Sequence, residues 1–519
     1  MRSRTIGGLV PLILAAALLT SCASSGDTSS PGASDGEPVS GGTLVVGLGG
    51  YPTSFNPNQA KTAPANSVYR SILEPLVYAD VENAGALEPM LATSWELDGT
   101  AWVLTLRDDV TWSDGTPFTA DDVVATIDLM QHGEPASQYL SRISFVTGVT
   151  AVDEHTVRFD TDGQSATLPT ALSDVYMYQA AQIAEGGNDA INAGPIGTGP
   201  FKIDSVSEGV EVTVVRNENY WGQAPLLDEV VFKAIPDDST RAAALQSGEI
   251  DIAYNVPPDT AVALDGANGI SIQWVPTGQA MVLSIFTESD DLPEPLKDPR
   301  VRQALNYAVD KQAIVDQALL GYGATLDGQI LGSDGVGYDP SIEAYPYDPD
   351  RAKQLLADAG YPDGFSMVIN TATGRYVKQQ EIPQLIAGYL QKVGIDAEVR
   401  TLEWSDLNAG HSKGTFGVTY AGWNYYPSMD ADAPLQLYTC TARKMFCDQQ
   451  FDDLLVQERS EFDPDKRTAI LQEMGRILHD QAASVFMFQS PDIFGVRSNV
   501  HGFVPTADDM VHVESIWVG

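Results

Sequence analysis

Hydrophobic and polar positions along the chain follow two periods, one typical of strands and one typical of helices. Apolar runs with the character of strands occupy residues 42–47, 102–106, 212–215, 230–232 and 395–399. Apolar residues near helical spacing occupy residues 239–248, 299–320, 349–359, 381–393, 450–459 and 464–482. Because helices and strands are interspersed throughout, the pattern predicts an α/β fold.

Two local signals mark helix ends. Thr119 and Asp122 have the spacing of a capping box, in which two side chains satisfy backbone N–H groups at a helix start. The segment 299–320 is the longest predicted helix, with Pro299 in its first turn and Gly321 directly after it. Both signals agree with the helical spacing of the neighbouring apolar residues.

The amino-terminal residues have the order of a secretory signal. Arg2 and Arg4 precede an apolar run at 6–19 that is too short to span a bilayer comfortably. The residues before Cys22 resemble a bacterial lipobox, so residues 1–21 are predicted to be a signal peptide whose removal leaves Cys22 carrying lipid. The alternative is an ordinary secreted protein with a free Cys22.

Residues 22–42 are mostly small or polar and contain no aromatic residue. Such a segment cannot bury enough surface to offset its chain entropy, so it is predicted to be a flexible tether between the lipid and a folded body. A GxSxG pattern at 32–36 falls within this tether. A nucleophile elbow needs a strand, a sharp turn and a helix around it, so we attribute the match to chance.

The chain has 519 residues and a formal net charge of −41. This length is ample for a large core and more than one lobe. A polyanion of this size is expected to avoid nucleic acid and anionic lipid head groups. The acid excess fits either a cationic ligand or, more commonly, a solvated acidic surface.

Besides Cys22, the chain contains Cys440 and Cys447. Outside the cytosol these two are predicted to form a disulfide bond, which closes a small loop and fixes local geometry. A zinc site is the rival interpretation, but no histidine or further cysteine lies nearby at ligand spacing. We predict no cofactor, no catalytic group and no resident metal.

Six sequence blocks, taken in order, resemble the dipeptide-, oligopeptide- and nickel-binding proteins of ABC importers, known as solute-binding protein family 5. The most specific block reads LEPMLATSWELDGTAWVLTLRDDVTWSDGTPFTADDVVAT and occupies residues 87–126. The others are GTGPF at 197–201, NENYW at 217–221, LQSGEIDIA at 245–253, DPRVRQAL at 298–305 and YDPDRAKQLLADAGYPDG at 347–364. The resemblance covers nearly the whole mature chain.

This resemblance implies a type II periplasmic-binding-protein fold of the α/β class, with two lobes and an extra subdomain in the first. Lobe I is expected to comprise residues 43–75, 196–277 and 488–519. The extra subdomain is expected at 76–195, and lobe II at 278–487.

Several residues of the family blocks have a structural interpretation. Trp102, Trp112, Asp114 and Gly115 are expected to form a tight turn and core, because buried tryptophans and turn glycines are usually packing devices. Arg300 and Arg302, at the start of a predicted helix, are expected to form surface or interlobe ion pairs.

The segment AGWNYYPSMDAD at 421–432 contains the GW motif that a strand near the cleft carries in this family. Peptide-binding members place an aspartate three residues beyond the tryptophan, where it pairs with the peptide's ammonium. This chain has Tyr426 there, which supplies no permanent negative charge near neutral pH. Either Asp430 or Asp432 replaces the aspartate after the loop folds back, or both are solvated loop acids.

The candidate ligand-binding residues come from three parts of the chain. They are Tyr51, Thr53, Gln279, Trp423, Asn424, Tyr425, Tyr426 and Asp430. Flat side chains with polar tips suit ligands such as peptides, sugars or opines. The three aromatics at 423–426 admit two interpretations. Either Trp423 and Tyr425 lie on the core face of a strand and Tyr426 faces the cleft, or several of the three line the pocket; at least one is expected to touch the ligand.

The resemblance implies a lipid-anchored, monomeric receptor on the outer face of the bacterial membrane, or in the periplasm, that passes a small solute to ABC permease subunits. A peptide is the first choice of solute, followed by an oligosaccharide or a nickel complex. The rival from another class is a lipid-anchored secreted hydrolase, although the six histidines form no HExxH pair. A third interpretation is a sensor or chaperone that works without a transporter.

Overall fold

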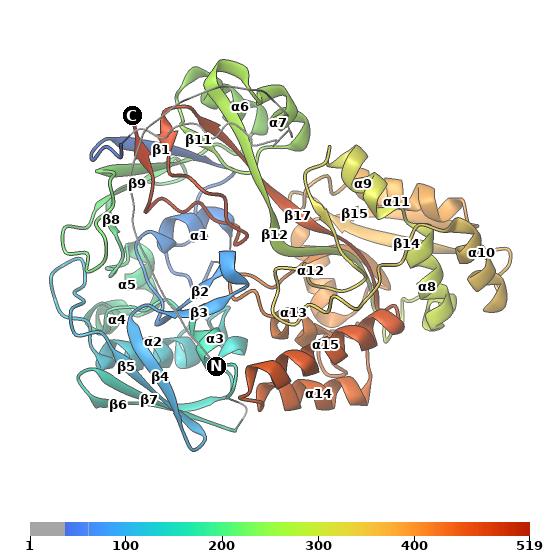
Figure 1. The fold of residues 1–519 in the computed structure, drawn as a ribbon, viewed down its shortest axis with the longest axis horizontal. Coiled ribbons are helices and arrows are strands. Elements are labelled where there is room, and N and C mark those ends of the chain that lie inside the picture. Colours follow the sequence, from blue (N-terminus) through green and yellow to red (C-terminus); the bar gives the residue numbers. More distant parts are fainter. Residues whose placement is uncertain (1–36, 61, 164) are drawn as a thin grey trace, which may run out of the picture. The chain divides into compact units, whose positions relative to one another are not determined.

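The computed structural model describes residues 37–60, 62–163 and 165–519 (Figure 1). The chain divides into two units, Met1–Glu37 and Pro38–Gly519, and the fold below is that of the second. The predicted signal peptide, the lipidation site Cys22 and most of the predicted tether lie outside the described residues. Within the described part, none of the helices combines the length and the apolar character needed to cross a membrane.

An 11-stranded mixed sheet runs through the folded body, in the order β15-β14-β16-β12-β17-β11-β1-β10-β9-β8, with β13 paired to β17 off this path. Its strands are β1 (Thr43–Leu48), β8 (Phe201–Ser207), β9 (Glu211–Arg216), β10 (Glu229–Ala234), β11 (Ile252–Ala253), β12 (Ile270–Ile285), β13 (Ala324–Thr325), β14 (Phe365–Ala372), β15 (Ile395–Leu402), β16 (Val418–Asn424) and β17 (Ser484–Arg497). Strand β1 pairs in parallel with β10, whereas β16 pairs antiparallel with β12.

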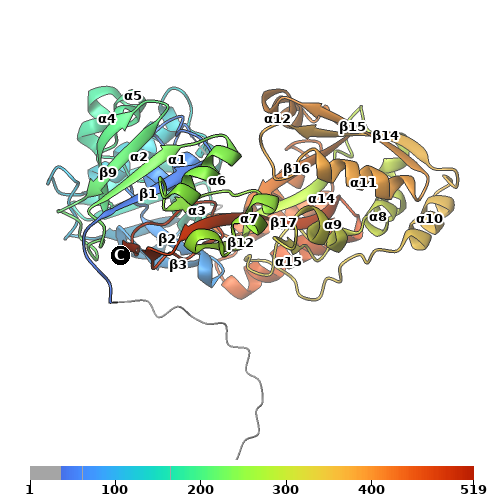
Figure 2. The same cartoon turned by 90° about the horizontal axis from the view of Figure 1, so that it is seen from above.

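Two long strands, β12 and β17, connect the two lobes (Figure 2). Their ladder pairs Ile270–Pro276 with Pro491–Arg497 at the first lobe. It resumes at the second lobe with Ala280 opposite Gln489, and the register is irregular between Pro276 and Ala280. The ladder is therefore interrupted where the chain passes between lobes. The boundaries at 277/278 and 487/488 that we expect from the sequence stay a prediction.

Helices flank the sheet in both lobes (Figure 1). In lobe I these are α1 (Ala63–Arg70), α6 (Asp238–Ser247) and α7 (Pro258–Leu264). In lobe II they are α8 (Pro299–Ala308), α9 (Lys311–Ala318), α10 (Pro349–Asp358), α11 (Glu381–Gln391), α12 (Trp404–Lys413), α13 (Asp432–Leu435), α14 (Gln449–Arg459) and α15 (Pro464–Asp480). Each lobe encloses an apolar core of its own, with Val46 and Phe232 in the first and Leu305 and Ile369 in the second.

The extra subdomain is built around a four-stranded antiparallel sheet of order β4-β5-β7-β6. Its strands are β4 (Ala92–Asp98), β5 (Ala101–Leu106), β6 (Val146–Asp153) and β7 (Thr156–Thr161), next to the hairpin β2 (Val77–Asp80) and β3 (Ala86–Pro89). Its helices are α2 (Ala120–His132), α3 (Leu168–Leu172), α4 (Ala180–Gly186) and α5 (Asn188–Ala193). A short ladder of β18 (Val500–His501) with β19 (Trp517–Val518) lies near the carboxyl terminus.

The signature block has the structural role that the sequence predicts. Trp112 is fully buried and donates its indole N–H to Asp122 at 3.2 Å. Asp122 also accepts from the backbone N–H of Thr119 at 2.9 Å, as a capping box requires. Gly115 has φ +88°, a conformation that glycine adopts at little steric cost. The block therefore forms a turn and the core of the subdomain.

Two predictions about the segment after residue 298 are wrong. The single helix expected at 299–320 is two helices, because Val309 is extended and Asp310 starts α9 by accepting the N–H of Ala313 at 3.0 Å. Arg302 forms no surface ion pair: its side chain is buried and donates to backbone carbonyls, including that of Gln481 at 2.7 Å. Arg300 does pair with Asp298, at 2.6 Å.

The predicted disulfide bond between Cys440 and Cys447 is present. Among the residues that the structure describes, no group of three or more histidine, cysteine, aspartate or glutamate side chains is placed to hold a metal ion.

Candidate functional site

A cavity of about 220 Å³ lies where β12 and β17 pass between the lobes. Lobe I contributes the turn after β1, the start of α1 and Tyr254, and lobe II contributes Arg375 and Tyr426. The connecting strands contribute Gln279 and Asp492. Because both lobes and both connecting strands line this cavity, a solute held in it contacts every part that moves in a hinge closure.

A larger cavity, of about 450 Å³, has a different location. It is lined by residues of lobe II alone, along β14 and β15 and at the start of β16. A solute bound there would touch one lobe only and would not link the two. The cavity at the lobe junction is therefore the better candidate.

A chain of hydrogen bonds crosses the wall of the junction cavity. The side-chain amide of Gln279 donates to Asn424 at 2.9 Å, and Asn424 donates to the Tyr426 hydroxyl at 2.9 Å. Tyr426 in turn donates to Asp509 at 2.8 Å. These three hydrogen bonds fix the position of Tyr426 through groups on β12, β16 and the carboxyl-terminal segment. Three of the predicted site residues, Gln279, Asn424 and Tyr426, therefore lie together here.

Acidic groups occupy one side of the same cavity. The Tyr254 hydroxyl lies 3.2 Å from Asp492 and also hydrogen-bonds to Asp509. Burial raises the pKa of Asp492 well above its usual value of 3.8, and the neighbouring Asp509 carboxyl raises it further. Burial raises the pKa of Asp509 as well, against the hydrogen bonds from Tyr254 and Tyr426.

Arg375 lines the cavity from lobe II and is itself exposed. Its guanidinium carbon lies 5.1 Å from the ring centroid of Trp404 and 5.8 Å from that of Tyr376. Its backbone N–H donates to Gln379 at 2.8 Å, which holds the turn that carries it. A guanidinium placed on aromatic faces keeps donors in a fixed plane, which suits a carboxylate of the ligand.

Trp423 and Tyr425 lie in the apolar core of lobe II. Trp423 donates its indole N–H to Ser284 at 2.9 Å, and Tyr425 accepts the N–H of Gly332 at 3.0 Å while donating to Asp334 at 3.0 Å. Neither side chain lines the junction cavity. Tyr426 does, and Asn424 joins it in a neighbouring cavity of about 110 Å³.

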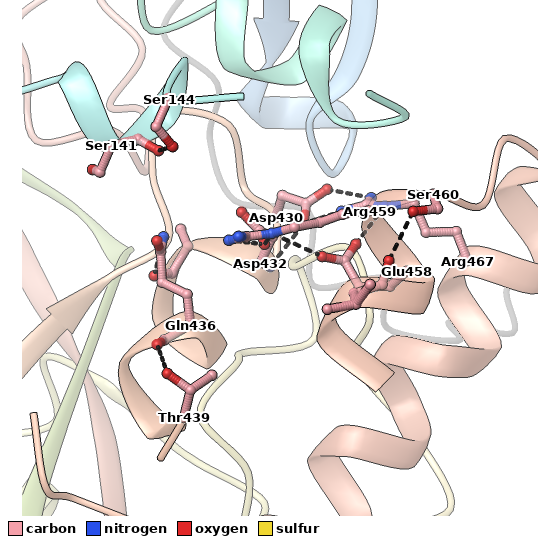
Figure 3. Close-up of polar contacts among 12 residues, drawn as sticks. Ser141, Ser144, Asp430, Asp432, Gln436, Thr439, Glu458, Arg459, Ser460 and Arg467 are labelled. Carbon is pink, nitrogen blue, oxygen red and sulfur yellow. Dashed lines mark hydrogen bonds and ion pairs between the residues drawn. The ribbon is translucent and has the colours of Figure 1, made fainter. Parts of the chain in front are cut away.

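Asp430 and Asp432 take part in a buried charge cluster at the start of α13 (Figure 3). Asp430 accepts two hydrogen bonds from Arg467, at 2.7 and 2.9 Å, and Asp432 accepts from Arg459 at 2.7 Å. Burial raises the pKa of the adjacent Glu458, and the charge of Asp432 adds to that effect. Asp430 is thus buried and Asp432 partly buried, both are paired with arginines, and neither lines the junction cavity.

The two candidates after the first strand also lie outside the cavity wall. Tyr51 packs against the lobe I core with its ring edge toward Phe55, at 6.4 Å between centroids. Thr53 is exposed. Their neighbour Gly49 lines the cavity instead.

Of the residues that line the cavity, the sequence predicts only Gln279 and Tyr426. The lining residues that it does not predict include the four on which the chemistry of the cavity depends, namely Tyr254, Arg375, Asp492 and Asp509. Asp492 carried a signal in the sequence, since it interrupts a run of apolar residues that forms the buried strand β17. A charged residue in such a run is costly unless it serves a partner or a ligand. The other three lie in loops whose neighbours in space are far away in the sequence.

Comparison with known proteins identifies the family. The family described as bacterial extracellular solute-binding proteins, family 5 Middle, matches residues 86–445. The dipeptide-binding protein of Escherichia coli K12 is 28% identical, with 91% of this chain and 94% of that protein covered. The glutathione-binding protein GsiB of the same strain is 28% identical, with 96% and 95% covered.

A solved structure agrees with this result. The binding protein AgaA in complex with agropinic acid, from A.tumefacien R10, has a TM-score of 0.77 and 28% identity, with 92% of this chain and 99% of that chain covered. The fold, with its two lobes and extra subdomain, is thus a periplasmic-binding-protein fold, as the sequence predicts. The chain belongs to the bacterial extracellular solute-binding proteins of family 5, whose members bind solutes and are not enzymes.

Proposed function

We propose that this protein is the extracytoplasmic receptor of an ABC importer, which captures a short peptide at the lobe junction and releases it unchanged to the permease. The observation that carries the proposal is the junction cavity, whose polar groups come from both lobes and both connecting strands. Ligand contacts to both lobes stabilise the closed state of such a hinge. The named ligands of the two relatives, a dipeptide and glutathione, support a peptide.

The composition of the cavity supports a small zwitterionic ligand. Arg375 offers a guanidinium to a carboxylate, and Gln279 and Tyr426 offer hydrogen bonds. The volume of about 220 Å³ is below the range of about 300–1,000 Å³ typical of drug-sized ligands. We therefore infer a peptide of a few residues rather than a long one. Agropinic acid, the ligand of AgaA, represents the rival class of opines.

The attachment of the receptor is a second part of the proposal. Residues 1–21 would be removed and Cys22 would carry lipid, so that residues 22–42 tether a monomeric body to the outer face of the membrane. The motif and the tether composition support this arrangement. Metabolic labelling with a tagged fatty acid would mark the wild-type protein and leave Cys22→Ala unlabelled; labelling of both would exclude this site.

Identification of the natural solute tests the receptor function directly. The protein is purified under mild conditions, denatured gently, and the released small molecules are analysed by mass spectrometry. We expect one peptide of a few residues per chain, which rebinds in calorimetry and is recovered intact. A sugar, an opine or a metal complex would contradict the peptide assignment, and conversion of the solute into product would contradict the receptor function.

A further inference from the structure

Two carboxyl groups in the junction cavity share one hydroxyl hydrogen. The Tyr254 oxygen lies within hydrogen-bond distance of both Asp492 and Asp509. A tyrosine hydroxyl has a single hydrogen to donate, so it can serve only one of the two carboxylates at a time. If both acids were ionised, the Tyr254 hydroxyl would donate its hydrogen to one carboxylate. Its oxygen would then lie close to an oxygen of the other carboxylate with no hydrogen between the two.

Tyr426 does not supply a hydrogen bond to Asp492. Its hydroxyl oxygen accepts from Asn424, and its one hydrogen goes to the second carboxyl oxygen of Asp509. Asp509 therefore receives hydrogen bonds from two tyrosines, one of each lobe. The hydrogen missing between Asp492 and Tyr254 has to come from a proton on Asp492 or from a positively charged donor in the cavity.

The surroundings of the pair favour a cation. Asp492 is 5% exposed and lies on β17, and both acids line the cavity. Two further charged groups act on the pair: Arg375 lowers the pKa of Asp509, and Asp508, which lies 2.8 Å from His512, raises the pKa of both acids. The shared Tyr254 hydrogen leaves a place for a proton between Asp492 and Tyr254. Burial and repulsion by Asp509 raise the pKa of Asp492, which favours the protonated carboxyl in the free protein in the same way.

We propose that Asp492 and Asp509 select a cationic nitrogen of the ligand, such as the free amino terminus of a short peptide, which replaces the proton between Asp492 and Tyr254. The assignment rests on the proposed function of the cavity. An ammonium has three N–H donors, enough to reach both carboxylates. On binding, Asp492 loses its proton to solvent and accepts an N–H of the ligand, so one proton leaves for each ligand bound.

The test compares probes that differ only in this charge. Alanyl-alanine and glutathione are each titrated into the full chain in the free-amine form and in the N-acetylated form. The wild type is expected to bind the free amine of at least one probe at least tenfold more tightly. Its affinity should rise as the pH increases above the ordinary aspartate range, and calorimetry in two buffers should detect one released proton.

Variants assign the effect to the two acids. In Asp492→Asn and Asp509→Asn the preference for the free amine should fall at least tenfold, while binding of the N-acetylated form changes less. Asparagine keeps the shape and can donate where a protonated Asp492 would, so folding should be retained; circular dichroism checks this. Asp339→Asn is the matched control: it removes a buried acid of lobe II that does not line the junction cavity and is not among the groups that shift the pKa of Asp492 or Asp509, so it should keep the preference.

The outcomes distinguish failure of the Asp492–Asp509 assignment from failure of the proposed receptor function. Equal affinity of the wild type for both forms of a probe, or an unchanged preference in Asp492→Asn and Asp509→Asn, would overturn the assignment while leaving the receptor function in place. Binding of neither form of either probe, with no peptide among the released molecules, would contradict the receptor function, and the assignment with it.

Discussion

At the scale of single residues, the GW segment divides its aromatic side chains between two tasks. Trp423 and Tyr425 complete the core of lobe II, and Tyr426 faces the cavity. Alternation along a strand predicts that neighbours face opposite sides, but it does not reveal which side is the core. The chain supplies the acids of the cavity from Asp492 and Asp509, which no spacing rule connects with residue 426.

Removing the Tyr426 hydroxyl should weaken ligand binding without unfolding the protein. Tyr426→Phe keeps the ring but leaves the amide of Asn424 and the carboxyl of Asp509 each without one partner. A lost hydrogen bond to a charged group contributes about 1.5–3 kcal/mol, so we expect roughly a tenfold loss of affinity. Calorimetry with the released solute measures it; unchanged affinity would exclude Tyr426 from the site.

Trp423 should behave in the opposite way. It is 8% exposed and packed in the core, so Trp423→Ala is expected to lower the free energy of unfolding by about 3–5 kcal/mol. Trp423→Phe, which keeps most of the volume, should cost less. Urea unfolding measures both. A wild-type stability for Trp423→Ala, combined with lost binding, would show that this residue contacts the ligand instead.

At the scale of secondary structure, the sequence predicts the presence of helices better than it predicts where they end. It also predicts helices better than the long strands. The break between α8 and α9 had a signal, because Asp310 precedes Lys311 as a capping residue would. The sequence does not predict strand β17, because the polar residues and proline at 489–492 divide it into two short apolar runs, and a short apolar run is compatible with either a buried strand or a buried helix. The burial of Arg302 is not predicted because three of its five hydrogen bonds go to the carbonyls of Gln481 and Ala482, 179 and 180 residues away in the sequence.

Helix α9 carries a pH-dependent element at its first residue. Burial lowers the pKa of Lys311 to about 7, and its amine donates to the carbonyls of Asn306 and Tyr345 at 2.6 and 3.2 Å. The unfolded chain keeps this lysine protonated up to about pH 10.5, so between pH 7 and 10.5 it binds more protons than the folded chain. The lysine therefore makes stability rise with pH in that window.

The variant Lys311→Met should remove this rise. The difference in unfolding free energy between wild type and variant is expected to change by up to about 4 kcal/mol from pH 7 to pH 10, in favour of the wild type at high pH. Urea unfolding at four pH values measures the difference, in which other titrating groups cancel. Parallel curves for the two proteins would contradict the assignment.

At the scale of the whole molecule, the lobe architecture follows from the family blocks, while the cavity does not. Its walls meet because β12 pairs with β17 across more than 200 residues of sequence, and local patterns do not encode such pairings. The resemblance of the blocks gives the fold class. The chemistry of the cavity depends on residues that lie outside those blocks, so the sequence predicts only Gln279 and Tyr426 of its wall.

One ion pair connects the lobes beside the cavity. Lys378 in lobe II pairs with Asp259 of α7 in lobe I, and Asp259 is 66% exposed. Exposed pairs contribute about 0.2–1 kcal/mol and are screened by salt, so Asp259→Asn should weaken binding by less than about fivefold, and less still at high salt.

Calorimetry at two salt concentrations measures the effect. Glu294→Gln is the control, because it breaks an exposed pair with Lys297 inside lobe II and should leave affinity unchanged. An equal loss in both variants, or a loss that persists at high salt, would show that the pair does not act between the lobes.

The central claim is that a peptide links the two lobes and leaves the protein intact. Small-angle X-ray scattering of the solute-free protein, before and after saturation with the peptide identified by mass spectrometry, tests it most directly. A smaller radius of gyration in the bound state, with the peptide recovered unchanged, is the predicted result. A radius that stays the same at saturation, or a peptide recovered in cleaved form, would contradict the account.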